Sequence, residues 1–234
     1  MVENNIQRIS CLIPTFNEEE RIGHILKILV GLKGSLLDEI IVIDDGSSDT
    51  TTQIVSTFKE VTLLRNKCNK GKSFSIVKGI ENARNELLLM IDGDLIGITA
   101  NNIRELIQPI LNKTADITIS YRGNTPKWWI RLFKIETFSG ERCFSKSLLV
   151  DFLEELKNIP GYGLEVFMNN QCIIRKLRIA SVPMNNVTIK FKWHKHGWLL
   201  GIWKEILMWK HIFSVVNPLK LLRQVLDMKK LMKD

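Results

Sequence analysis

The chain has 234 residues, of which 45% are hydrophobic and 25% are charged, and its formal net charge is +8. This composition is ordinary for a globular protein, the length favours one large α/β domain, and the positive charge favours an anionic partner such as a nucleotide, a phosphorylated acceptor, a membrane surface or nucleic acid. The four cysteines form no CxxC pair, which excludes zinc-ligand spacing and predicts free thiols in a reducing cytosol. We find neither an apolar run of the roughly 18 residues that a bilayer span needs nor a signal-peptide pattern in MVENNIQRIS, so we expect a cytoplasmic protein.

An apolar segment followed by a helical pattern occurs four times before residue 113. Strands are predicted at residues 9–14, 39–43, 61–64, 87–91 and 116–120, and helices at 18–30, 50–58, 72–84 and 102–112. We expect Asn17, Asp49, and either Asn101 or Asn102 to cap three of these helices. The alternation predicts a mostly parallel sheet with helices on both faces.

Residues 87–95 (LLLMIDGDL) carry the strongest chemical signal. Five apolar residues predict a strand that is buried on both faces, and Asp92 and Asp94 follow it at once with Gly93 between them. Carboxylates at a strand end lie in the crevice where open α/β sheets bind ligands, and two hard oxygen ligands suit Mg²⁺ or Mn²⁺ shared with a substrate phosphate. The alternative is an ordinary Asp-Gly turn with two solvated acids.

Two further strand ends carry polar groups. Asp44 and Asp45 follow the second strand, where a carboxylate can accept a hydrogen bond from a base or a ribose, and a plain turn before the next helix is the alternative. After the third strand, residues 65–73 (RNKCNKGKS) place Lys72 at a helix start, which is a natural phosphate site. Because Asn66 stands where a P-loop needs its first glycine, we exclude a P-loop, and a solvated basic loop is the alternative.

Residues 121–234 differ in character from the first half. We predict a loop and an amphipathic helix at 121–138, a turn that presents polar groups at 138–142, a helix that opens at 161–163 and carries Glu165, and a hairpin formed by 179–182 and 186–191. The tail at 198–233 is predicted to be helical and amphipathic, with a break at Asn217-Pro218. Its tryptophans and lysines fit packing on the domain or a homodimer face, or else a helix that lies on an anionic membrane surface.

These motifs, in this order, resemble one family of enzymes. PTFNEEE, IVIDDGSSDTT, NKGKSFSIVKG and MIDGDL resemble the nucleotide-sugar domain of family 2 type glycosyltransferases, which have the Rossmann-like GT-A fold. SGERCF, and GYGLEV followed by a downstream histidine, look like the retaining glucosyl-3-phosphoglycerate synthases. The resemblance implies a GT-A domain at 1–197, with a nucleotide-sugar half at 1–120 and an acceptor half at 121–197, before an amphipathic helical extension at 198–234.

The resemblance also implies the residues of the site. It makes Asp94, Glu165 and Lys72 catalytic, and it makes Asp94 and His194, with His196 as the alternative to His194, the ligands of Mg²⁺ or Mn²⁺. The nucleotide-sugar-binding residues that it implies are Pro14, Thr15, Glu18, Asp44, Asp45, Lys72, Asp92, Gly93 and Lys192. The acceptor-binding residues that it implies are Gly140, Arg142 and Tyr162.

The activity expected from these features is metal-dependent transfer of a sugar from a UDP- or GDP-sugar, with a UDP-glucose type of donor favoured, to a small phosphorylated or hydroxyl acceptor with retention. One alternative is transfer to a polyprenyl phosphate or another membrane lipid, with the tail in peripheral contact with the inner face of the membrane. Another is non-catalytic binding of a nucleotide sugar. A nucleotidyltransferase would need a glycine-rich loop near the first strand, where PTFNEEE has no glycine. Nucleic acid is disfavoured as a partner, because the basic residues are spread out and no recognition motif occurs.

Overall fold

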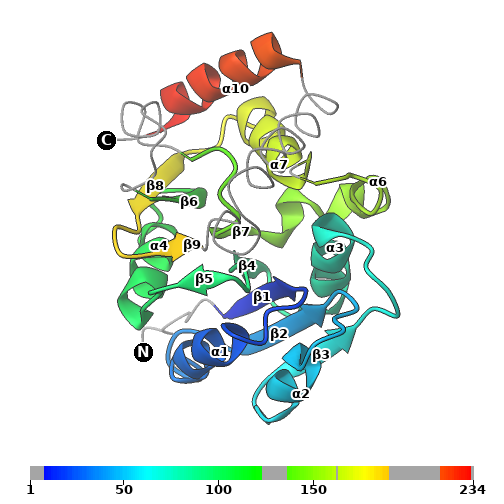
Figure 1. The fold of residues 1–234 in the computed structure, drawn as a ribbon. Coiled ribbons are helices and arrows are strands. Elements are labelled where there is room, and N and C mark those ends of the chain that lie inside the picture. The colour runs from blue at the N-terminus through cyan, green and yellow to red at the C-terminus, as the bar shows by residue number, and fades with distance from the viewer. Residues whose placement is uncertain (1–7, 123–135, 162, 190–216, 233–234) are drawn as a thin grey trace.

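A seven-stranded sheet forms the centre of the molecule in the computed structural model, which describes residues 8–122, 136–161, 163–189 and 217–232 (Figure 1). The strands of this sheet are β1 (Ile9–Thr15), β2 (Glu39–Asp44), β3 (Thr62–Arg65), β4 (Leu87–Met90), β6 (Ile117–Tyr121), β7 (Arg142–Ser145) and β8 (Ile179–Pro183). Their spatial order is β3-β2-β1-β4-β7-β6-β8, and the neighbouring pairs are parallel except the two that include β7. The predicted mostly parallel sheet is therefore confirmed.

Helices cover both faces of this sheet, as expected for a Rossmann-like α/β fold. The helices are α1 (Ile22–Val30), α2 (Thr51–Ser56), α3 (Lys72–Asn82), α4 (Ala100–Leu111), α6 (Leu153–Leu156), α7 (Gly163–Ile174) and α10 (Pro218–Leu231), with 3₁₀ turns η1 (Lys146–Leu148) and η2 (Val150–Phe152) before α6. One core contains side chains of α1, α2 and α4, and a second core contains side chains of α3, α6, α7 and α10. The two cores lie on opposite faces of the sheet, because successive residues of a strand point to opposite sides.

Strand β4 is buried on both faces, as its uninterrupted apolar sequence predicted. Leu87 and Leu89 enter the core that contains α1 and α4, whereas Leu88 and Met90 enter the core that contains α3 and α7. Because β4 lies between β1 and β7, neither of its edges faces solvent. The sequence DGD therefore begins at the carboxyl edge of the parallel strands, where α/β sheets bind their ligands.

Strand β7 begins at the last residue of the segment for which we predicted a polar turn, 138–142. Before it, the backbone N–H of Ser139 donates to the carbonyl oxygen of Glu136 at 2.9 Å in a turn, and residues 139–141 have no regular secondary structure. The strand pairs antiparallel with β4, and Arg142 lies opposite Met90. An antiparallel strand begins at the edge where its parallel neighbours end. The residues just before β7, Gly140 and Glu141, are therefore brought beside Asp92.

The predicted hairpin of residues 179–182 and 186–191 was wrong. β8 pairs in parallel with β6 in the main sheet, whereas β9 (Thr188–Ile189) pairs with β5 (Leu95–Ile96) in a separate two-stranded sheet. Tertiary pairing thus overrides the short sequence separation of the two segments.

Two of the predicted helix caps differ in the structure. Asn17 adopts a left-handed backbone conformation with φ 55° and lies before α1, which begins only at Ile22. Helix α4 is capped by Thr99, whose hydroxyl accepts a hydrogen bond from the backbone N–H of Asn102 in a reciprocal capping box. At α2 the residue just before the helix is Thr50, which makes no capping hydrogen bond with its side chain. The carboxylate of Asp49, one residue earlier, accepts a hydrogen bond from the backbone N–H of Thr51.

The carboxyl-terminal prediction is confirmed where the structure describes it. Helix α10 begins at Pro218, and the side chain of Asn217 accepts a hydrogen bond from the backbone N–H of Leu219, so the break at Asn217-Pro218 is a helix start. Four predicted features lie wholly or mainly outside the described residues. They are the amphipathic helix within 121–138, the strand residues after Ile189, the tail at 198–216 and the domain boundary at 197/198.

Candidate active site

A cleft of about 380 Å³ lies at the carboxyl edge of the sheet, between the ends of β1, β2 and β4 and the starts of α3 and α7. The residues that line it are Pro14, Thr15, Phe16, Glu18, Asp45, Asn69, Gly71, Lys72, Ser75, Asp92, Gly93, Asp94, Gly161 and Glu165. Most of the site residues that the sequence implied in the described part of the chain are therefore brought together. The exceptions are Asp44, Gly140 and Arg142, which the structure places differently.

A lysine between two carboxylates forms the floor of this cleft. Nζ of Lys72 lies 2.7 Å from Oδ1 of Asp92 and 2.8 Å from Oε1 of Glu165, although Glu165 is 93 positions further along the chain. Burial by itself would lower the pKa of Lys72, but the attraction of Asp92 and Glu165 outweighs it and raises the pKa well above its usual value. Lys72 is therefore a fixed positive charge in the cleft.

Two buried oxygens of the cleft lack a hydrogen-bond partner among the described residues. They are Oε2 of Glu165, on a side chain that is only 1% exposed, and Oγ1 of Thr15, on a residue that is 4% exposed. A buried polar atom without a partner is costly, and such atoms in a cleft are commonly satisfied by a ligand or a water. The orphaned oxygens therefore mark the cleft as a place where a polar molecule binds.

Gly140 explains how the segment before β7 approaches the ion pair so closely. A Cβ atom at this position would collide with Nζ of Lys72 and Oδ2 of Asp92, and it would lie 2.7 Å from Cγ of Asp92. Gly140 therefore does not line the cleft but packs its backbone against the side chains that do.

Three carboxylates share the region beyond β4. Burial raises the pKa of Asp92 to about 6 despite the opposing charge of Lys72, and the charges of Glu141 and Asp94 add to the rise. Burial and the charge of Glu141 likewise raise the pKa of Asp94. The ionised forms of Asp92 and Asp94 are therefore disfavoured in the protein without a divalent cation.

Glu141 itself is completely buried and was not singled out from the sequence. Its Oε2 accepts hydrogen bonds from Ser139 at 2.6 Å and Ser120 at 2.7 Å, and lies 3.2 Å from a guanidinium nitrogen of Arg122. Although burial opposes it, the attraction of Arg122 and these hydroxyls lower the pKa of Glu141, so it stays ionised behind the acidic pair. Glu141 lies within the SGERCF motif, but the resemblance assigned acceptor binding to its neighbours Gly140 and Arg142 instead.

The donor set fits a divalent cation such as Mg²⁺ or Mn²⁺. Asp92 and Asp94 offer hard carboxylate oxygens at the mouth of the sheet, and because burial raises the pKa of both, a bound divalent cation would favour their ionised forms. Within the described ranges no group of three His, Cys, Asp or Glu side chains is close enough to hold a metal. The predicted further ligand, His194, its alternative His196, the phosphate-binding candidate Lys192, and Tyr162 lie outside the described residues.

The raised pKa of Asp92 predicts how stability depends on pH. The carboxyl of Asp92 loses its proton at a pH of about 4 in the unfolded chain but only at about 6 in the folded protein. We therefore expect the free energy of unfolding of the chelator-treated protein to fall by on the order of 1–3 kcal/mol as the pH rises from about 4 to 6, and to level off above that. Urea unfolding at several pH values measures this slope. Asp92→Asn should remove most of it, and an unchanged slope in that variant would contradict the assignment.

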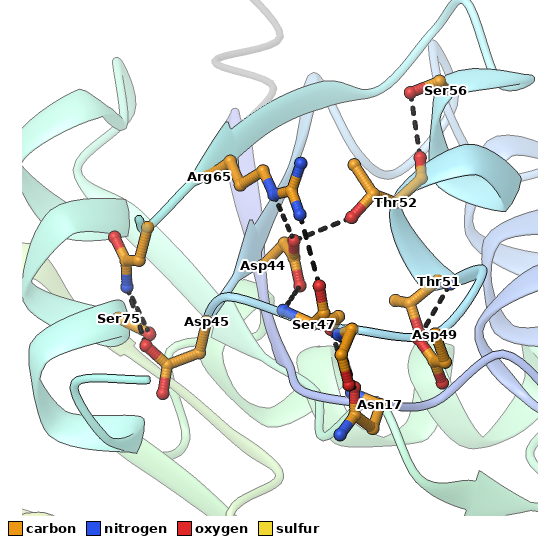
Figure 2. Close-up of polar contacts among 12 residues, drawn as sticks. Asn17, Asp44, Asp45, Ser47, Asp49, Thr51, Thr52, Ser56, Arg65 and Ser75 are labelled. Atoms are coloured by element: carbon orange, nitrogen blue, oxygen red, sulfur yellow. Dashed lines mark hydrogen bonds and ion pairs between the residues drawn. The ribbon is translucent and has the colours of Figure 1, made fainter. Parts of the chain in front are cut away.

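Asp44 and Asp45 point to different sides of the sheet edge, as Figure 2 shows. Asp45 lies in the cleft and accepts hydrogen bonds from Asn66 Nδ2 at 2.8 Å and from the backbone N–H groups of Lys70 at 2.9 Å and Gly71 at 2.8 Å. The same carboxylate that we expected at the base therefore also shapes the loop before α3.

Asp44 is buried on the far side, away from the cleft. Its carboxylate accepts hydrogen bonds from Ser47 N at 3.1 Å and Thr52 Oγ1 at 2.8 Å, and it lies 3.2 Å from Nε of Arg65 (Figure 2). These contacts join β2 to β3 and α2. They give Asp44 a role in holding the strand end rather than in touching a nucleotide.

Arg142 is fully buried and does not reach the cleft. Its guanidinium donates hydrogen bonds to the carbonyl oxygens of Ser139 and Thr137 and to Oδ1 of Asn169, each at 2.8 Å. Asn169 also lies 3.3 Å from Gln224, on α10, and donates to Thr137 O at 2.9 Å. Arg142 therefore fastens the segment that ends in Gly140 to α7 and α10.

Comparison with known proteins agrees with this geometry. The sequence profile described as Glycosyl transferase family 2 matches residues 10–167. A dolichyl-phosphate beta-glucosyltransferase from Dictyostelium discoideum is 30% identical over 186 residues, which cover 70% of this chain and 49% of that protein, so the chain spans about half the length of this relative. An uncharacterized protein from Methanocaldococcus jannaschii is 40% identical over 196 residues, which cover 72% of this chain and 83% of that protein.

Solved structures share the fold. The glucosyl-3-phosphoglycerate synthase of Mycobacterium tuberculosis, in complex with Mn²⁺, uridine diphosphate and phosphoglyceric acid, superimposes with a TM-score of 0.70 over 89% of this chain and 78% of that chain, at 20% identity. At this identity the likeness shows a common architecture.

Proposed function

Because the chain belongs to glycosyl transferase family 2, we propose that it transfers a sugar from a nucleotide diphosphate sugar, of the UDP-glucose type, in a reaction that needs Mg²⁺ or Mn²⁺. The observation that carries the proposal is the cleft in which Lys72, Glu165, Asp92 and Asp94 meet at the ends of the parallel strands. The mycobacterial synthase that shares this fold is in complex with Mn²⁺ and uridine diphosphate, which supports the choice of donor and cation.

The residues of the cleft divide into those that hold the donor and those that act on it. We assign Thr15, Glu18 and Asp45 to the nucleotide, because they lie together at the ends of β1 and β2. Asp92 and Asp94 would hold the divalent cation, which when bound supplies positive charge for the departing diphosphate. Lys72 adds a fixed positive charge on the same side, where negative charge develops as the bond to the sugar breaks.

Glu165 is assigned to the sugar. The anomeric carbon becomes cation-like as the diphosphate leaves, and a carboxylate held nearby stabilises that charge. Oε1 of Glu165 is held by Lys72, and Oε2 is buried without a partner among the described residues, so one oxygen is free to meet a sugar hydroxyl or the cation-like ring. With the retention that we propose, the acceptor would approach on the face that the diphosphate leaves.

Two classes of acceptor follow from two different observations. The complex of the mycobacterial synthase contains phosphoglyceric acid, which supports a small phosphorylated acceptor. The Dictyostelium relative is named for transfer to dolichyl phosphate, which supports a lipid phosphate. Both acceptors are anionic, as the net charge of +8 favours, and we keep the small phosphorylated acceptor as the first assignment.

Calorimetry tests the proposal directly. UDP-glucose, other UDP-sugars and GDP-sugars are titrated into the full chain with MnCl₂ and with a chelator, and anomeric NMR follows any transfer product. We expect metal-dependent binding of at least one nucleotide sugar and a product with the donor's configuration. Flat titrations across the panel would overturn the proposed function, whereas binding with an inverted product would overturn only the assignment of retention.

A further inference from the structure

Helix α10 has a buried face and an exposed face, and large apolar side chains occur on both. Leu221, Gln224 and Met228 are buried, with Met228 in the core that contains α7. On the other side Leu219 is 77% exposed, Leu222 is 55% exposed and Leu226 is 43% exposed. Because these leucines are spaced by three and four residues, they form a single stripe along the helix. In Figure 1, α10 lies across one end of the molecule, over α7.

Basic side chains border this stripe. Arg223 follows Leu219 by four residues and precedes Leu226 by three, and Lys229 and Lys230 follow Leu226 by three and four, so each is a neighbour of a stripe leucine on the helix surface. The side chain of Arg223 is 85% exposed and that of Lys230 is 75% exposed. Asp227 is the sole acid in α10, against four basic residues.

The connection from α7 to β8 carries further exposed side chains. Met232, just after α10, bridges to Ile179 at the start of β8, so the turn between α7 and β8 lies by the end of the helix. Ile174, the last residue of α7, is 70% exposed, and the turn that follows it carries the exposed Arg175 and Lys176. An exposed isoleucine and two exposed basic side chains therefore lie on the connection that leads from α7 to the strand beside the end of α10.

We propose that the outer face of α10 docks on an anionic lipid surface. Leucine side chains would enter the boundary between headgroups and acyl chains, while the arginine and lysine side chains contact lipid phosphates. With 14 residues the helix would lie along the surface, and none of the described helices is long and apolar enough to cross a membrane. The inference does not depend on the proposed reaction.

Charge favours lipid over a second copy of the chain as the occupant. In a two-fold dimer through this face the same surface meets itself. The four basic residues of one α10 would then approach the four of the other, with only Asp227 in each helix to offset them, and like charges opposed across an interface are unfavourable. An anionic headgroup layer offers the complementary charge.

Vesicle sedimentation of the full chain tests the proposal without any nucleotide sugar, so failure of the proposed reaction cannot affect the result. Vesicles of phosphatidylcholine alone are compared with vesicles that contain equal parts of phosphatidylcholine and phosphatidylglycerol, at low and high salt. We expect binding to the anionic vesicles that salt weakens. The triple variant Leu219→Ser, Leu222→Ser and Leu226→Ser should bind at least about tenfold more weakly.

Two controls distinguish docking through α10 from misfolding and from nonspecific hydrophobic binding to vesicles. The replaced leucines are exposed, so the triple variant should keep its thermal unfolding midpoint. The matched variant Ile96→Ser with Val150→Ser removes exposed apolar side chains elsewhere, which are 40% and 42% exposed, and should bind vesicles like the parent chain. Three results would each overturn the proposal. They are absence of vesicle binding, undiminished binding by the triple variant, and a dimer in analytical ultracentrifugation that the triple variant abolishes while vesicles stay unbound.

Discussion

Replacing Asp94 by alanine is expected to lower the rate of sugar transfer by about 10²–10³-fold or more, because the variant loses a group assigned to the cation that stabilises the departing diphosphate. Asp94 lines the cleft immediately beyond β4, in the same group of acids as Asp92 and Glu141. Mn²⁺ affinity should fall together with the rate. Initial rates with a nucleotide sugar and Mn²⁺ titrations on the same preparations measure both quantities.

The fold should survive this substitution. Burial and the charge of Glu141 raise the pKa of Asp94, so its ionised form is unfavourable in the metal-free protein. Asp94→Ala should therefore keep or raise the thermal unfolding midpoint measured with a chelator. Asp151→Ala is the matched control, since this aspartate is exposed in η2, and it should leave the rate unchanged. Near-normal turnover by Asp94→Ala in the presence of a chelator would exclude the metal-assisted scheme.

The parts of the site that could be predicted from the sequence are those in which the function of a residue follows from its immediate neighbours. Asp92 and Asp94 follow an apolar run that must be a buried strand, so their place at the sheet edge follows from local pattern and parallel topology. Lys72 begins α3 for the same kind of reason. The predicted strand-helix alternation of the first half was confirmed because its period and turn residues were consistent along the chain.

What could not be predicted depends on contacts between distant segments. The ion pair between Lys72 and Glu165 joins residues 93 positions apart, and neither side chain alone indicates the other. Arg142 illustrates the opposite error. An arginine two residues after a glycine suggested a ligand contact, whereas its place at the start of β7 buries its guanidinium, which donates hydrogen bonds to three protein acceptors. Strand β7 is short and has a polar residue at each end, so its own sequence does not predict a strand. Its pairing with β4 and β6 defines it.

Neighbouring residues at a strand end raise a related difficulty. Asp44 and Asp45 have the same chemistry, and both were expected at the nucleotide. Because consecutive side chains of an extended segment point to opposite sides, only one of them can enter the cleft (Figure 2). The register that decides between them is set by the pairing of β2 with β1 and β3, which is a property of the whole sheet.

Gly140→Ala is expected to reduce activity by about 10²-fold, since a displacement on the order of 1 Å in a catalytic group has an effect of this size. The added methyl group would collide with Lys72 Nζ and Asp92 Oδ2. These atoms are the ends of flexible side chains, so they can move away, and we expect a loss of only about 1–3 kcal/mol in the free energy of unfolding. The ion pair and the direction of Asp92 would change, so Mn²⁺ affinity should fall as well.

The matched control is Gly31→Ala at the end of α1. There a Cβ would meet only the backbone oxygens of Ile28 at 3.4 Å and Lys27 at 3.5 Å, with the residue in a right-handed helical conformation. This variant should keep full activity and unfold at or slightly above the parent midpoint, because alanine restricts the unfolded chain. Displacement of the catalytic ion pair should change the rate by about 10²-fold. If Gly140→Ala transferred sugar within about twofold of the parent rate, the packing of the segment before β7 against Lys72 and Asp92 would not be what positions that pair.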